Sequence, residues 1–315
     1  MPLAVALFDA GELKRALRIA EECLALIRTA EGASSANSAA ALGLTALILG
    51  DLGKLVPALA RHEEAVAIRR KALPAGHADI AESLNNIALV LSALGRHQEA
   101  LERQEEALTI SLKALPAGHR FIAIAIDNIG GVLDALGRHQ EALERHEEAL
   151  AIRRKALPAG HPDIAQSLKN IAGVLGDLGR HQEALERHEE ALAIWRKALP
   201  AGHPDIANSL YNIGLTLTAL GRSAEAKVLR EEVFAIRAAR AADNPSALLS
   251  DCRECADRAA KHGDHPGALY WLNQALDLIP AQPTAGLPDP DALRREITQE
   301  RADLAADGDG SDPPP

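Results

Sequence analysis

The chain has 315 residues, a formal net charge of −10 at pH 7 and only 2% aromatic residues. The scarcity of Tyr, Phe and Trp, together with the abundance of Ala, Leu, Glu and Arg, predicts an all-helical protein. Lys and Arg alternate with Glu instead of forming a basic stripe, which argues against a nucleic-acid-binding protein. Three cysteines provide no disulfide framework, and no apolar run approaches the length of a membrane span. We therefore expect a cytoplasmic protein without membrane contact.

An internal repeat of 42 residues runs along nearly the whole chain. A glycine recurs with this spacing, and an alanine follows each glycine after five residues. A period of 20–50 residues is typical of solenoids and arrays, whose usual function is to hold a partner. The glycines are Gly11, Gly53, Gly95, Gly137, Gly179, Gly221 and Gly263, and the alanines are Ala16, Ala58, Ala100, Ala142, Ala184, Ala226 and Ala268.

The first hairpin of the array is expected to be partial, because Met1 falls inside its first helix. The unit 165–206 shows the complete pattern. Its first helix carries an apolar stripe at helical spacing and ends at Gly179, since glycine is the preferred residue after a helix. A second helix follows over about 180–197. The loop 199–205 then breaks the chain and begins the next unit.

Three columns of the repeat hold small residues, which lets the helix axes approach closely. One of them is the alanine column that begins at Ala16. The other two are Ala4, Ala46, Ala88, Gly130, Ala172, Gly214 and Ala256, and Cys23, Ala65, Ala107, Ala149, Ala191, Val233 and Ala275. No hairpin can bury its apolar face alone, so neighbouring hairpins must stack.

The pattern resembles the tetratricopeptide repeat. The runs Asn-Ile-Ala/Gly, Leu-Gly-Arg-His-Gln-Glu-Ala-Leu and Glu-Glu-Ala-Leu carry the resemblance over about 1–280. The 42-residue spacing and the Leu-Pro-Ala-Gly-His-Pro-Asp loop look like the kinesin-light-chain subtype. The resemblance implies an all-α, right-handed α-solenoid over 1–280, with about six hairpins after the partial one. It also implies a protein-binding scaffold.

The C-terminal region departs from the repeat. We predict a proline-rich linker over 281–290, a capping helix over 291–306 and a disordered acidic tail over 307–315.

Two stretches of the array, 136–165 and 178–207, are identical except at Arg153 and Trp195. This near identity suggests a tandem duplication, and it makes exchange of helices between hairpins a hazard. Trp195 is expected to be exposed. It is then either a contact anchor or a neutral result of the duplication.

By resemblance, one amide column lies on the first helices and faces a concave groove. An amide side chain both donates and accepts hydrogen bonds, so it could hold the backbone of an extended peptide. The alternative is that the amides only bond to neighbouring helices or water. The column is Asn86, Asn128, Asn170 and Asn212, and the flanking groove positions are Glu82, Asn85, Asp127, Asp134, Gln166, Lys169, Asp177, Asn208 and Tyr211. Four acids against one base predict a neutral or basic peptide.

A cysteine and histidine cluster near the C-terminus, Cys252, Cys255, His262 and His265, could bind zinc. The repeat register favours another interpretation, because both cysteines fall in columns of core Leu and Ile residues. A free cysteine at such a position behaves as a small hydrophobe. The preferred interpretation is a packed core without metal, and a metal-dependent activity is the weaker alternative.

Two histidine columns stand where the resembled family usually has aromatic residues. They are His97, His139, His181 and His265, and His62, His146 and His188. We interpret each imidazole as replacing an aromatic ring at a helix interface, with metal coordination or pH sensing as the alternative. Buried neutral histidines resist protonation, so the stability of the fold should fall below about pH 6.5.

The function predicted from the sequence is that of a non-enzymatic scaffold or adaptor without a cofactor. It would hold an extended peptide or a partner protein in the groove, with Asn128, Asn170 and Asn212 fixing the peptide backbone and Tyr211 and Lys169 selecting side chains. The alternative is a regulatory or sensor module of a larger bacterial-type signalling or defence system, with its effector domain on another chain. The sequence contains no nucleophile elbow, phosphate loop or His-Glu-x-x-His motif.

Overall fold

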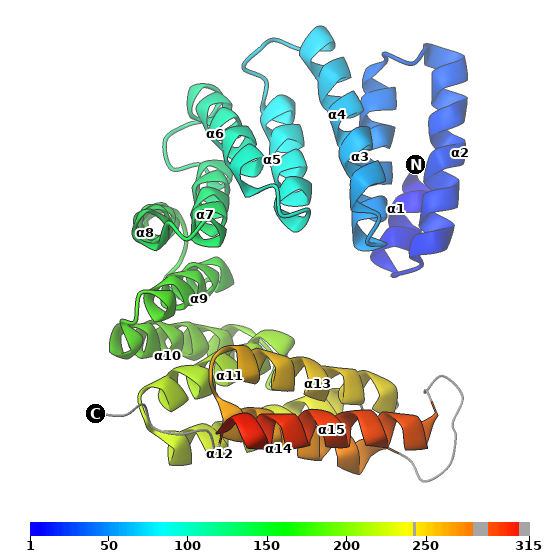
Figure 1. The fold of residues 1–315 in the computed structure, drawn as a ribbon. Helices are drawn as coiled ribbons and strands as arrows, with labels where there is room; N and C mark the ends of the chain where they lie inside the picture. The colour runs from blue at the N-terminus through cyan, green and yellow to red at the C-terminus, as the bar shows by residue number, and fades with distance from the viewer. Residues whose placement is uncertain (242–243, 280–288, 309–315) are drawn as a thin grey trace. The chain divides into compact units, whose positions relative to one another are not determined.

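The computed structural model describes residues 1–241, 244–279 and 289–308, and this part of the chain consists of helices and turns (Figure 1). Consecutive helices pack against each other as hairpins. The hairpins are α1 (Pro2–Asp9) with α2 (Leu13–Glu31), α3 (Ala36–Asp51) with α4 (Leu55–Ala72), α5 (Ala78–Ala93) with α6 (His97–Ala114), α7 (Arg120–Ala135) with α8 (His139–Ala156), α9 (Pro162–Asp177) with α10 (His181–Ala198), α11 (Pro204–Ala219) with α12 (Ser223–Arg240), and α13 (Pro245–Lys261) with α14 (His265–Leu278). The predicted fold class, an all-α solenoid of stacked hairpins, is confirmed.

The hairpins group into two compact units, Met1–Ala159 and Gly160–Pro315. Unit 1 contains the helices α1 to α8. Unit 2 contains α9 to α14 and one further helix, α15 (Pro290–Gly308). None of the described helices is long and apolar enough to cross a membrane.

The repeated glycines close the turn inside each hairpin. All seven have φ between +71° and +75°, a left-handed conformation that costs glycine little because it has no Cβ. After α5, for example, the N–H of Gly95 donates to Ser92 and the N–H of Arg96 donates back to the carbonyl of Leu91, both at 2.9 Å. These bonds satisfy carbonyls that the end of the helix would otherwise leave open.

The small columns lie in the core, as the repeat predicts. Every alanine of the column from Ala16 to Ala268 has no exposed surface. The column from Ala4 to Ala256 is also buried, including Gly130 and Gly214. Close helix packing along both units therefore rests on the same few positions in each hairpin.

A histidine caps the first helix in four of the hairpins. The imidazole Nδ1 of His77, His119, His161 and His203 accepts a hydrogen bond from the backbone N–H two residues later, at 3.2–3.3 Å. This bond satisfies one of the N–H groups that a helix start leaves without a partner. The His of the repeated loop thus defines where each of these helices begins.

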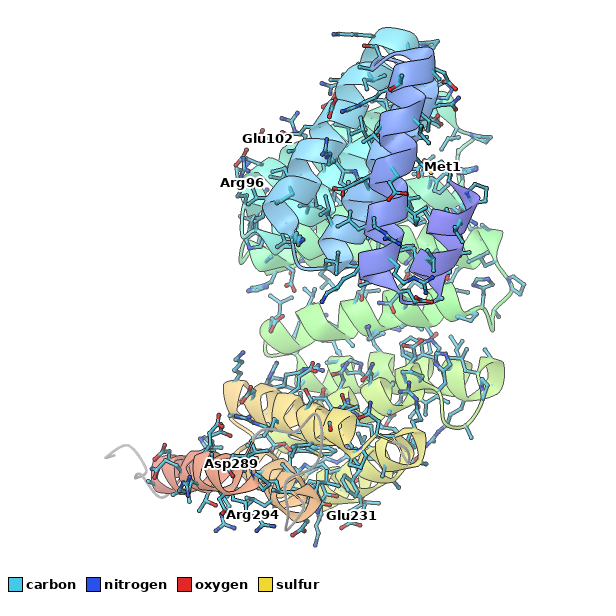
Figure 2. All side chains as sticks on the ribbon, turned by 90° about the vertical axis from the view of Figure 1, so that its right-hand side faces the viewer. Met1, Arg96, Glu102, Glu231, Asp289 and Arg294 are labelled. Carbon is cyan, nitrogen blue, oxygen red and sulfur yellow. The ribbon has the colours of Figure 1, made fainter. Side chains whose placement is uncertain are left out.

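The second helices carry the charged surface. Arg96 donates to Glu99 at 2.7 Å. The same pair, with its members three residues apart, recurs in later hairpins as Arg138 with Glu141 and Arg180 with Glu183. Figure 2 shows Arg96 and Glu102 at the outer edge of unit 1. Exposed pairs of this kind contribute little to stability. These pairs lie on a solvent-exposed face, to which we assign no function.

Helix α15 packs against α14 and buries Leu293 and Ile297. Arg253 of α13 also donates to Glu296 and Glu300 of α15, at 2.8 and 2.6 Å. The predicted linker up to residue 288 and the predicted tail from residue 309 lie outside the described residues.

Candidate functional site

The amide column stands at one position of the first helices α5, α7, α9 and α11. All four side chains, Asn86, Asn128, Asn170 and Asn212, are half-buried, so each keeps an accessible edge.

In unit 1 the amides link neighbouring hairpins. Asn128 of α7 donates to Asn85 of α5 at 2.6 Å, and Gln104 of α6 donates to the same oxygen at 3.1 Å. Part of the amide capacity is therefore used inside the protein, as the alternative interpretation of the column holds. The side chain of Asn86 makes no hydrogen bond within the described part of the chain.

Asp127 lies in the interior of the α7–α8 hairpin. It accepts from His146 Nδ1 at 2.6 Å and from Arg153 at 3.0 Å, and it is only 8% exposed. Burial alone would raise the pKa of this carboxyl, but the His146 hydrogen bond and the Arg153 charge outweigh burial and hold the pKa below its usual range. Asp127 therefore serves the hairpin core, and we leave it out of the proposed ligand contacts.

In unit 2 the corresponding polar groups are also engaged. Gln166 donates to Asn170 at 2.9 Å. Asn208 accepts from Arg237 at 3.1 Å, and Asn212 accepts from Arg258 at 3.2 Å. The amide nitrogen of Asn212 keeps its donor capacity, because the arginine occupies only the oxygen.

Tyr211 is a core residue. Its side chain is 3% exposed, its hydroxyl donates to the carbonyl of Cys255 at 2.8 Å, and the guanidinium of Arg258 lies 4.8 Å from its ring centre. Burial raises the pKa of this phenol. In this structure Tyr211 cannot select the side chains of a peptide, whereas Lys169 is half-buried and accessible.

The cysteine and histidine candidates for zinc do not assemble. Cys252 and Cys255 are fully buried in α13, and the sulfur of Cys255 accepts from Arg237 at 3.0 Å. Burial raises the pKa of both thiols, to about 12 and about 11. His262 is exposed and bonds the carbonyl of Arg258. No three of the candidate side chains bring their ligand atoms within 4.8 Å of one another.

Trp195 is buried, and the expectation of an exposed side chain is wrong. It is 2% exposed and occupies the repeat position of Arg153. The first helix explains the exchange, because Lys169 stands where the preceding hairpin has Asp127. An arginine beside Lys169 would place two cations in one hairpin, and tryptophan avoids this. The stretches 136–165 and 178–207 alone do not predict this relation, because both partner positions, 127 and 169, lie outside them.

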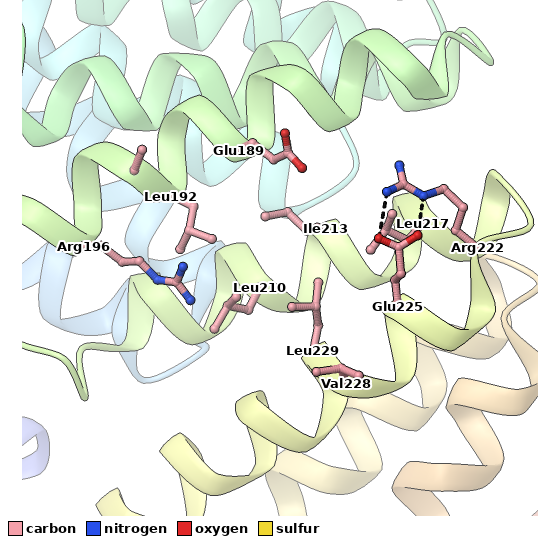
Figure 3. Close-up of a pocket in the computed structure, with 11 residues that line it drawn as sticks. Glu189, Leu192, Arg196, Leu210, Ile213, Leu217, Arg222, Glu225, Val228 and Leu229 are labelled. Carbon is pink, nitrogen blue, oxygen red and sulfur yellow. Dashed lines mark hydrogen bonds and ion pairs between the residues drawn. The ribbon is translucent and has the colours of Figure 1, made fainter.

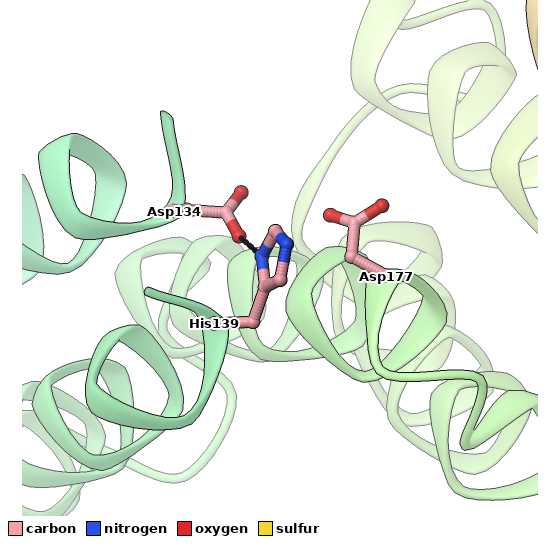
Figure 4. A group of neighbouring side chains, drawn as sticks. All are labelled: Asp134, His139 and Asp177. Atoms are coloured by element: carbon pink, nitrogen blue, oxygen red, sulfur yellow. Dashed lines mark hydrogen bonds and ion pairs between the residues drawn. The ribbon is translucent and has the colours of Figure 1, made fainter. Parts of the chain in front are cut away.

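The histidine columns separate into two environments. His139 is half-buried and its Nδ1 lies 2.8 Å from the carboxylate of Asp134 (Figure 4). His62 and His188 are buried instead, at 2% and 4% exposure. Burial lowers the pKa of both to about 4, helped by the nearby charges of Arg69 and Lys169 respectively.

A surface cavity of about 500 Å³ lies between α10, α11 and α12 (Figure 3). Its floor is apolar, with Leu192, Leu210 and Ile213, and Arg222 and Glu225 pair at its rim. The three preceding hairpins place the charged dipeptide Glu-Arg where this one has Val228-Leu229. The apolar pair Val228-Leu229 is the signal for this cavity in the sequence.

Stacked helical hairpins, each closed by a left-handed glycine and sealed by small residues, define an α-helical repeat protein. The profile of the tetratricopeptide repeat family matches residues 1–71, 79–155 and 163–239, which is more than half of the chain. The chain therefore belongs to the tetratricopeptide repeat family. The search of curated proteins found no match.

Solved structures support the assignment and its subtype. Nearly identical tetratricopeptide-like repeats of a putative kinesin light chain from Podosopora anserina are 30% identical, with a TM-score of 0.57 over 65% of this chain and 98% of that chain. BtubC (BKLC) from P. vanneervenii is 20% identical, with a TM-score of 0.62 over 72% and 92%. Apo RapI is 19% identical, with a TM-score of 0.64 over 87% and 94%. The last two are similar in fold alone.

Proposed function

We propose that this chain is a non-catalytic scaffold that binds an extended peptide or a partner protein through the first helices within its units. The observation that carries the proposal is the half-buried amide column on α5, α7, α9 and α11. The Asn86 side chain has both its carbonyl oxygen and its amino group available for a ligand. Asn128 has its carbonyl oxygen available, and Asn212 has its amino group available. Such groups can bond the backbone of a peptide in either direction.

The charge of the face supports a neutral or basic partner. Glu82 is exposed, while Asp127 is compensated inside the hairpin by Arg153. Lys169 is the accessible base among the flanking positions of the groove. The proposed function requires no cofactor, since main-chain hydrogen bonds and side-chain contacts are sufficient for binding.

The test is affinity capture from cell lysate with the full chain as bait, read by mass spectrometry and followed by titration of the captured partner. Replacing Asn86, Asn128 and Asn212 by Ala should weaken binding by about tenfold or more, because each lost hydrogen bond contributes about 0.5–1.5 kcal/mol.

The matched control is Gln98, Gln140 and Gln182 replaced by Ala. These are also three amides one repeat apart, but they are exposed on the second helices. We expect this control to bind as the unmodified chain does. Partners that are lost from the glutamine variant and kept by the folded asparagine variant would contradict the proposal.

A further inference from the structure

Three exposed aliphatic side chains stand at one position of the repeat on the first helices of unit 1. Val5 of α1 is 41% exposed, Leu47 of α3 is 42% exposed and Leu89 of α5 is 50% exposed. Among the residues that the structure describes, they account for three of the nine large apolar side chains that are exposed. Exposed apolar residues are normally scattered singly, so their recurrence in one column needs a reason.

The three side chains belong to helices that follow one another in the stack (Figure 1). Ile48 of α3 lies in one core cluster with Ala4 and Leu7 of α1 and with Ala16 and Ala20 of α2. Helix α5 follows α3 through α4, which packs against both, and the Asn128–Asn85 bond joins α5 to α7. We call Val5, Leu47 and Leu89 the apolar strip.

The strip ends on α7 at a glycine. Gly131 occupies the same repeat position, and a Cβ added there would meet no atom within 4 Å. The contact face at this position is therefore open, and no side chain of the hairpin covers the end of the strip.

The charged side chains on the helices that carry the strip are all negative. Helices α1, α3 and α5 contain Asp9, Asp51, Asp79 and Glu82, and they contain no Lys or Arg. Asp9 and Asp51 follow Val5 and Leu47 by four residues, which places each acid on the same helix face as the aliphatic residue. Asp79 is half-buried, whereas Asp9, Asp51 and Glu82 are exposed.

We infer that the apolar strip binds a partner segment that presents apolar side chains next to Lys or Arg. The apolar side chains would cover Val5, Leu47 and Leu89, and the cations would face the acids one turn away. The inference rests on the proposed function and deepens it, because it assigns the chemistry of the partner and places its apolar contacts in unit 1.

The experiment selects random dodecapeptides displayed on phage against the full chain. The enriched peptides should combine Leu, Ile, Val, Met or Phe with Lys or Arg and should be poor in Asp and Glu. Their binding should weaken by about tenfold or more in the double variant Leu47→Gln/Leu89→Gln, because the strip loses two of its three apolar contacts. The charge variant Asp51→Lys/Glu82→Lys should weaken the binding of these peptides as well.

The matched control is Val56→Gln/Leu112→Gln. These residues are at least as exposed, at 68% and 57%, but lie on the second helices α4 and α6. Circular dichroism establishes that each variant is folded. Binding to the control should stay within about twofold of the unmodified chain.

The inference would be overturned if the enriched peptides were acidic or uncharged, or if no peptides were enriched. Equal binding of the peptides to the strip variant Leu47→Gln/Leu89→Gln and to the control Val56→Gln/Leu112→Gln would also overturn it. Peptides that require Asn86, Asn128 and Asn212 but tolerate the strip variant would remove the inference and leave the proposed function standing. Peptides lost only from the second-helix control would contradict both.

Discussion

At the scale of single residues, the polar side chains inside the hairpins are matched to one another. The α7–α8 hairpin places Asp127 with His146 and Arg153, whereas the α9–α10 hairpin has Lys169 with Trp195 at the equivalent positions. A buried charge is tolerated only when a partner compensates it. The identity of a polar residue inside a hairpin therefore depends more on its partners in that hairpin than on the residue at the same position of other repeats.

Two neighbouring glycines of α7 predict opposite effects of the same substitution. A Cβ on Gly130 would lie 2.8 Å from His146 Cε1, and Asp127 holds that imidazole in place. Gly130→Ala should therefore lower the free energy of unfolding by about 1–3 kcal/mol. Gly131→Ala should raise it by up to about 1 kcal/mol, since alanine is the better helix former and the site is open.

Urea denaturation followed by circular dichroism measures both glycine variants against the unmodified chain. Gly131→Ala is the control for the helix propensity of alanine. A shift of the same sign and size in both variants would show that His146 does not restrict position 130.

At the scale of helices and hairpins, the 42-residue register accounts for most of the fold. The glycine and alanine columns are sufficient to predict the hairpins and the buried seams, because these positions depend on backbone geometry and volume. The histidine caps were missed, since imidazole is not among the usual capping side chains. The burial of Trp195 and Tyr211 was missed as well, because it depends on partners in other helices that only the folded hairpins bring together.

The α9–α10 hairpin offers a test of this matching. Trp195→Arg would place a guanidinium in a site that is 2% exposed and lacks the carboxylate of the preceding hairpin. We expect a loss of about 3–5 kcal/mol in the free energy of unfolding, the usual effect of an uncompensated buried charge. Lys169→Asp in the same chain recreates the Asp127–Arg153 arrangement and should recover part of this loss.

The measurement is a double-mutant cycle from chemical unfolding of the unmodified chain, both single variants and the double variant. Lys169→Asp alone is the control, because it supplies a carboxylate without the arginine. Additive effects of the two substitutions would show that positions 169 and 195 are independent.

At the scale of the whole molecule, each unit carries a buried histidine whose folded form resists protonation. His62 lies in unit 1 and His188 in unit 2, and burial lowers the pKa of both from 6.5 to about 4. The unfolded chain then binds protons more readily than the folded chain below pH 6.5. Stability should be fully present above pH 6.5 and should be lost as the pH falls through about 4, at up to about 1.4 kcal/mol per pH unit for each histidine.

Denaturant titrations between pH 4 and pH 8 test this dependence. His62→Gln and His188→Gln are suitable variants because α6 already holds a buried glutamine, Gln104, at the same repeat position. The pH curve of each variant should be flatter than that of the unmodified chain. Parallel curves between pH 4 and pH 6.5 would contradict the assignment.

The matched interiors have a consequence for how the chain finds its correct pairing during folding. Helices α8 and α10 are nearly identical in sequence, so during folding α9 can pair with either of them. Closing on α8 would set Lys169 against Arg153 without an anion, and the displaced Asp127 would meet Trp195 without a cation. The residues at positions 127 and 153, and at 169 and 195, therefore favour the correct helix pairing over the incorrect one. The rest of the sequence of α8 and α10 can stay identical without loss of this specificity.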